Sequence, residues 1–102
     1  MIHVLATIEL NAGRREEFLA EFHRLMPLVR AEQGCIEYGP AVDLPTGLPA
    51  QEPVRPQTVV VIEKWADLPA LHAHLQAPHM VEYRGRLKEF VRAVRLQILQ
   101  PA

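Results

Sequence analysis

Five side chains able to take part in chemistry lie close together in the second half of the 102-residue sequence. Glu63 and Trp65 stand two residues apart in an apolar run, so both project from one face of a strand. A carboxyl group in such surroundings needs a partner or a raised pKa, which suits a general acid or base. His74 and His79 follow, and Tyr83 lies one helical turn beyond His79 on the same side. These residue types suit hydrogen bonding and proton transfer to a small molecule.

Each of these residues also has a structural interpretation. Trp65, at the end of a strand, could belong to the core. Glu63 could form a structural ion pair, for example with Arg84 of the last helix. His74 could be a helix residue facing water, and His79 could be a first-turn residue that bonds a nearby carbonyl. The sequence leaves both interpretations open.

The spacing of histidine and cysteine argues against a metal site. His74 and His79 are five residues apart rather than four, and His72 and His74 face different sides of a helix. Cys35 is the only cysteine, so it cannot form an intramolecular disulfide, and we expect a reducing, cytoplasmic location. The chain also has no Gly-rich phosphate loop, nucleophile elbow or dinucleotide fingerprint, and we expect no cofactor.

Composition indicates one soluble domain spanning residues 1–102. Apolar residues make up 49% of the chain, which excludes disorder, and the net charge of −1 gives no basic surface for nucleic acid or anionic lipid. No apolar run is long enough to cross a membrane, and Glu9 inside the first apolar stretch argues against a secretory signal.

Alternating or continuous apolar patterns predict four strands. They cover residues 2–10, 35–43, 58–65 and 94–100. Gly39 and Pro40 interrupt the second strand, which favours a bulge or an edge position. Between the second and third strands, residues 44–57 hold four of the nine prolines and form a stiff loop in this prediction. The loop could lie over a pocket mouth or across a dimer.

Helical periodicity predicts one helix over residues 14–33 and a second one that is broken in two. Asn11 is placed to cap the first helix, Pro27 to kink or split it, and Gly34 to end it. Its basic and acidic residues balance, which predicts a solvated face; they are Arg14, Arg15, Arg24, Arg30, Glu16, Glu17, Glu21 and Glu32.

The broken helix has a first piece over residues 68–75, which Asp67 caps. Its second piece starts at Pro78 and carries an apolar stripe that runs from Met80 through Phe90 to Val94.

The order β-α-β-β-α-β predicts an α+β, ferredoxin-like fold with one four-stranded antiparallel sheet and helices on one face. The run Val59–Ile62 places apolar side chains on both faces of the sheet. The uncovered face would expose an apolar patch that monomers rarely tolerate, so we expect a two-fold homodimer that packs sheet on sheet.

The chain resembles the antibiotic biosynthesis monooxygenase (ABM) family, in particular its quinol monooxygenase branch. The resemblance rests on the segments AGRREEF, GCIEY and VVVIEKWADLPALHAHLQAPHM, at residues 12–18, 34–38 and 59–80. It implies a dimeric α+β barrel, a pocket between sheet and helices, and oxidation of a small quinol or polyphenol by molecular oxygen without a cofactor. The substrate would supply the electrons, and the protein a dry pocket and hydrogen bonds.

The resemblance also implies roles for individual residues. Trp65 would be a pocket wall, His74 and His79 would hydrogen-bond or transfer protons, and Glu63 would orient one of the histidines. From facing and proximity we add two tyrosines as substrate-binding residues, Tyr38 and Tyr83.

One departure separates the chain from haem-degrading relatives. Their first strand carries an Asn where this chain offers Thr7, and their histidine does not match His74 or His79, so we do not expect haem chemistry. Two other functions fit the same residues. One is a non-catalytic dimer that binds a small molecule or acts in stress, and the other is an isomerase, cyclase or dehalogenase that uses an acid–base pair such as Glu63 and His79.

Overall fold

The computed structural model describes all 102 residues and has seven regular elements. They are β1 (Ile2–Leu10), α1 (Arg15–Arg30), β2 (Cys35–Ala41), β3 (Thr58–Trp65), α2 (Leu68–Gln76), α3 (Pro78–Leu87) and β4 (Val91–Leu99). The strands pair antiparallel in the order β2-β3-β1-β4. This arrangement confirms the predicted ferredoxin-like α+β fold with its second helix divided at Pro78.

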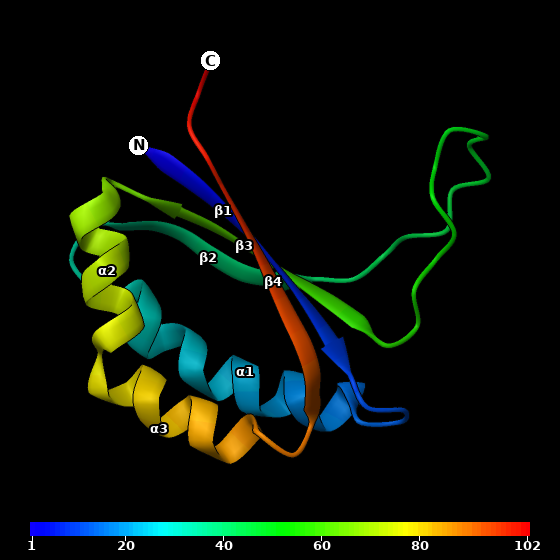
Figure 1. Cartoon of the computed structure of the whole chain (residues 1–102), viewed down its shortest axis with the longest axis horizontal. Coiled ribbons are helices and arrows are strands. Elements are labelled where there is room, and N and C mark those ends of the chain that lie inside the picture. Colours follow the sequence, from blue (N-terminus) through cyan, green and yellow to red (C-terminus); the bar gives the residue numbers. More distant parts are fainter.

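The three helices lie on one face of the sheet, and the core fills the space between the two layers (Figure 1). The period-two pattern of the strands decides which side chains enter it. Val4 and Ala6 of β1 and Val59 and Val61 of β3 are buried, whereas Leu5 between them is more than one-third exposed.

None of the three helices has the length and apolar character that a membrane span needs.

The helices do not reach over the edge strand β4. Val94 and Leu96 pair with Ile8 and Ala6 and therefore face the helical layer, yet they are 54% and 53% exposed. The space between the layers consequently opens to the outside along β4.

Pro27 does not split α1, which runs as one helix from Arg15 to Arg30. Pro27 and His23, whose carbonyl loses its helical donor, both lie on the exposed face, where water can replace the missing bond. Asn11 does not cap the helix either. Its Nδ2 donates to the Glu89 carbonyl at 2.8 Å and so joins the β1–α1 turn to the α3–β4 turn.

Gly34 has a different role from the predicted one. The helix ends at Arg30 with Ala31 as its C-cap, three residues before Gly34. Gly34 has a φ of +85°, and a Cβ added there would lie 2.6 Å from the Ala70 Cβ. Glycine is thus required because the turn into β2 is left-handed and because α2 passes directly over it.

The end of α3 was also predicted wrongly. The helix stops at Leu87, Phe90 lies in a turn, and β4 starts at Val91, three residues before the expected start. Phe90 is still buried in the core, so its apolar character continues the helical stripe without the helix. Asp67 does cap α2, since its Oδ1 accepts from the Ala70 N–H at 2.9 Å.

The proline-rich loop forms an arm that leaves the sheet between β2 and β3 (Figure 1). Arg55 closes its base by donating from Nε to Oδ2 and from Nη2 to Oδ1 of Asp43, both at 2.9 Å. Strand β2 ends at Ala41, two residues earlier than predicted, and is an edge strand, as Gly39 and Pro40 indicated.

Candidate active site

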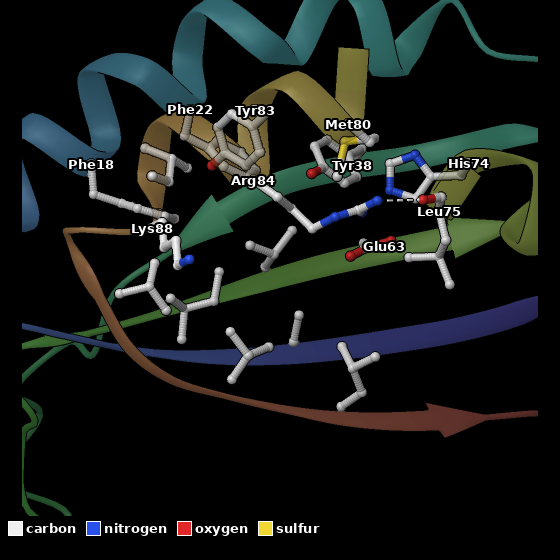
Figure 2. A pocket seen from close by; sticks show the side chains of 17 residues that line it. Phe18, Phe22, Tyr38, Glu63, His74, Leu75, Met80, Tyr83, Arg84 and Lys88 are labelled. Atoms are coloured by element: carbon white, nitrogen blue, oxygen red, sulfur yellow. Dashed lines mark hydrogen bonds between the residues drawn. The ribbon is translucent and has the colours of Figure 1, made fainter. Parts of the chain in front are cut away.

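A cavity of about 440 Å³ lies between the helical layer and the sheet. Thirteen of its 17 lining residues are hydrophobic. The four polar exceptions are Glu63, His74, Arg84 and Lys88. Figure 2 shows Glu63 and His74 near one end of the cavity and Lys88 near the other, beside Phe18. An apolar cavity with few polar groups is the usual form of a small-molecule site.

Glu63 comes from β3 and is the buried carboxyl group of the cavity. Its Oε1 accepts a hydrogen bond from the Trp65 Nε1–H at 2.9 Å, within the strand itself. Burial, with a smaller contribution from the nearby charge of Glu32, raises the pKa of Glu63 to about 7. Near neutral pH this carboxyl group can therefore either donate or accept a proton.

Two expectations about Glu63 are not met. It does not pair with Arg84, because the Arg84 Nη2 donates to the Leu75 carbonyl at 2.7 Å instead. It does not orient a histidine either, since its only protein partner is Trp65. Its second carboxyl oxygen has no protein partner and is available to a ligand.

Trp65 is fully buried and does not line the cavity, so its predicted role as a pocket wall is wrong. Its position at the end of β3 places the indole behind Glu63 and against the His74 ring, with the ring centroids 4.5 Å apart. Trp65 thus supports two cavity residues from behind, by one hydrogen bond and one ring contact.

His74 lies on α2, is 1% exposed and lines the cavity. Its Nδ1 lies 2.9 Å from Oε2 of Glu32. Burial lowers the pKa of His74 despite this hydrogen bond, which favours a neutral imidazole. A neutral ring that donates from Nδ1 to a carboxylate leaves Nε2 as an acceptor, and Figure 2 shows this second nitrogen turned towards the cavity.

His79 is the second residue of α3 and does not line the cavity. Its Nε2 lies 2.7 Å from the same Glu32 oxygen that His74 contacts. The His79 side chain is 24% exposed, so the structure brings the two predicted histidines to one carboxylate but leaves only His74 at the cavity.

Glu32 is the functional residue that the sequence analysis missed. It was assigned to a solvated helix face, but α1 ends two residues before it and the turn directs its side chain under α2 and α3. The side chain is only 14% exposed. Gly34 was the one signal that could have indicated this, because a left-handed turn so close by moves Glu32 off the helix face.

Tyr38 and Tyr83, which the sequence analysis added as substrate-binding residues, both line the cavity. The Tyr38 ring stacks on Phe22 with centroids 5.3 Å apart and meets His74 edge-on at 5.5 Å. Burial raises the pKa of both tyrosines, which therefore stay protonated. The Tyr83 hydroxyl is buried and has no hydrogen-bond partner in the protein.

The chain matches proteins of one family along most of its length. A sequence profile described as "Antibiotic biosynthesis monooxygenase" matches residues 1–86. The chain is also 38% identical to "Probable quinol monooxygenase YgiN" of Escherichia coli K12, over 99% of this chain and 98% of that protein. The chain belongs to the ABM family.

Solved structures agree with this assignment at the level of the fold. The ABM chain superposes on a conserved protein from Methanosarcina mazei with a TM-score of 0.83 at 24% identity, covering 99% of this chain and 92% of that one. Rv0793 from Mycobacterium tuberculosis gives a TM-score of 0.81 at 24% identity, covering 99% and 94%. At these identities the likeness extends to the fold and not to the site.

Membership of the ABM family supports monooxygenase chemistry and leaves the substrate open. In this ABM chain, no three His, Cys, Asp or Glu side chains form a group able to hold a metal ion. The ionisable groups on the apolar cavity include one carboxyl group, whose pKa of about 7 lets it exchange protons near neutral pH, and one imidazole, whose pKa burial lowers.

Proposed function

We propose that this ABM protein oxidises a small quinol or polyphenolic aromatic compound with molecular oxygen and without a cofactor. The observation that carries the proposal is the apolar, aromatic-lined cavity with Glu63 and His74 on its wall. A volume of about 440 Å³ suits a bicyclic or tricyclic aromatic molecule. The name of the Escherichia coli relative points to the same substrate class.

The proposed reaction needs no external electron donor. A quinol and O₂ give a hydroxyquinone and water: one oxygen atom forms a new C–O bond, the other leaves as water, and all four electrons come from the substrate. The first step is removal of a hydroxyl proton, which makes the ring rich enough in electrons to reduce O₂. His74 Nε2 or ionised Glu63 accepts that proton, and the apolar wall excludes water from the reactive anion.

The test is incorporation of labelled oxygen. The purified full-length chain is incubated under isotopically labelled O₂ with a reduced naphthoquinol or a hydroxyanthrone, and the product is analysed by mass spectrometry. We expect one labelled oxygen atom in the product and a rate well above autoxidation, which the Glu17→Gln variant, altered at an exposed side chain, should retain. The absence of enzyme-dependent label across such a panel would refute the proposal.

A second function is favoured by the same two residues. Glu63 and His74 make an acid–base pair, which also serves an isomerase or a cyclase. Such a reaction consumes no oxygen, so turnover that is unchanged under anaerobic conditions would replace the first proposal with this one.

We also propose that the protein is a homodimer through the sheet face opposite the helices. Leu5 and Ile62 are cross-strand neighbours at the centre of this face and are 37% and 38% exposed. Charged side chains surround this apolar centre, including Lys64 of β3. Ile62→Glu should convert a dimer into a monomer in sedimentation experiments, and a wild-type monomer at micromolar concentration would refute this arrangement.

The cytosol is the proposed compartment, since Cys35 is a free thiol.

A further inference from the structure

We propose that Glu32 is a positioning residue that fixes the orientation of His74 and, with His79, connects the cavity to solvent for proton transfer. The inference rests on the proposed function for its catalytic meaning, but the hydrogen-bond arrangement on which it depends can be tested without turnover. Glu32 itself does not line the cavity and acts only through the two histidines.

The geometry of the three side chains supports a relay. One oxygen, Oε2 of Glu32, lies 2.9 Å from His74 Nδ1 and 2.7 Å from His79 Nε2. Glu32 lies in the turn between α1 and β2, His74 on α2 and His79 on α3, and the two contacts join residues 42 and 47 positions apart in sequence. The exposure rises along the series, because the His74 side chain is 2% exposed, that of Glu32 14% and that of His79 24%. The series thus runs from the cavity wall to the surface.

The proton balance of the relay follows from these contacts. His74 donates its Nδ1 proton to Glu32, so Nε2 is unprotonated and can accept a hydroxyl proton from a substrate. The resulting imidazolium is stabilised by the adjacent carboxylate and passes its Nδ1 proton to Oε2. When the proton of the His79 ring is on Nδ1, His79 Nε2 accepts this proton from Oε2 and the ring releases a proton to water. His74 then carries its remaining proton on Nε2. The starting tautomer returns when Nε2 gives that proton to the oxygen atom that leaves as water and a proton taken up through His79 and Oε2 returns to Nδ1.

Other ionisable groups near His74 and Glu32 also affect how readily His74 takes up a proton. The groups that face His74 or Glu32 are Cys35 from the start of β2, Tyr38 from β2, Glu63 from β3, and His79 and Arg84 from α3. Arg84 opposes protonation of His74, and burial does so more strongly, so that the Glu32 carboxylate is the group that favours an imidazolium. Without that carboxylate, the buried ring would be a poor base.

The first test is nitrogen NMR of the histidine rings in wild-type protein and in Glu32→Gln, with Glu17→Gln as a matched control on the surface of α1. In the wild type we expect the His74 proton on Nδ1. In Glu32→Gln we expect a mixture of tautomers and a fall of roughly 10- to 1000-fold in the proton affinity of His74. Unchanged tautomer and affinity in Glu32→Gln, or an equal change in Glu17→Gln, would overturn the proposal.

The second test uses turnover of the naphthoquinol. Glu32→Gln should lower kcat by about 10- to 100-fold with KM within about twofold, and should displace the acidic limb of the kcat–pH profile. A purely structural role would change stability without moving that limb. If no substrate is turned over, the proposed function fails while the NMR result still decides the role of Glu32.

His79 supplies an independent variant if Glu32→Gln does not fold. His79→Ala removes the exposed end of the series and leaves the His74–Glu32 hydrogen bond in place. We expect the His74 tautomer to be retained and kcat to become dependent on buffer, with recovery on addition of imidazole. A His79→Ala protein whose kcat equals that of the wild type at low buffer concentration would refute the route to solvent.

Discussion

Replacing Glu63 by Gln should stabilise the folded protein at alkaline pH while reducing its activity. The amide keeps the shape of the carboxyl group, and its carbonyl oxygen can still accept the hydrogen bond from Trp65 Nε1. What the substitution removes is the cost of ionising a buried acid. Glu63 is only 6% exposed, and its pKa in the folded protein is about 7.

The magnitude follows from the difference between the folded pKa and the ordinary value of 4.5. Below pH 4.5 the group is protonated in both states and contributes nothing. Between pH 4.5 and 7 only the unfolded chain releases the proton, so stability falls as the pH rises, and above 7 the loss is constant. The folded pKa lies about 2.5 above the ordinary value, and each pKa unit corresponds to 1.36 kcal/mol. Ionised Glu63 therefore lowers the free energy of unfolding by about 3 kcal/mol at pH 8.

Urea unfolding of the wild type and Glu63→Gln measures this penalty, at one fixed protein concentration because dimerisation contributes to stability. The free energy of unfolding of the variant should exceed that of the wild type by about 1 kcal/mol at pH 5 and by about 3 kcal/mol at pH 8. Glu17→Gln, at an exposed position, should show no such pH dependence. A Glu63→Gln variant that is less stable than the wild type at pH 8, or a gain that does not grow with pH, would refute the reasoning.

Four further variants test packing and capping by the same urea measurement, with Gly13→Ala as the control for Gly34→Ala. Gly34→Ala should lower the free energy of unfolding by about 2–4 kcal/mol, because the new Cβ meets both a positive φ and a clash with Ala70. Gly13→Ala also has a positive φ but open space around the Cβ, so it should lower the free energy of unfolding by only about 1–2 kcal/mol. Tyr83→Phe should raise the free energy of unfolding by about 1 kcal/mol, because it removes a buried hydroxyl that has no partner in the protein. No gain is expected if bound water satisfies that hydroxyl fully. Asp67→Ala should lose about 1 kcal/mol with its N-cap.

The fold could be predicted from the sequence because its periodicities are strong and local. The alternation in β1 and the run of β-branched residues in β3 can be recognised without knowledge of the rest of the chain. The errors lie at element ends, where local pattern and tertiary packing compete. Phe90 continues the helical stripe of α3 but is buried by the turn into β4, and Pro27 is tolerated because its missing hydrogen bond faces water.

The site could be predicted only in part, because its contacts join residues far apart in sequence. Glu63 and His74 stand out as polar groups in apolar patterns, and both line the cavity. Glu32 stands among balanced surface charges, and only Gly34, two residues later, separates it from them. Its role depends on the turn at Gly34 and on how α2 and α3 pack over that turn, both of which are tertiary properties.

Burial favours the uncharged forms of two ionisable groups of the cavity, Glu63 and His74. Burial raises the pKa of Glu63 and lowers the pKa of His74, so near neutral pH both spend much of their time uncharged. An apolar cavity with little net charge suits the neutral quinol and O₂ of the proposed reaction, and Glu63, with a pKa of about 7, exchanges protons readily near neutral pH. The 3 kcal/mol that Glu63 is expected to cost at about pH 8 serves no structural purpose, since Gln would keep the hydrogen bond to Trp65. The presence of a destabilising acid at this position therefore supports the proposed role of Glu63 in proton transfer.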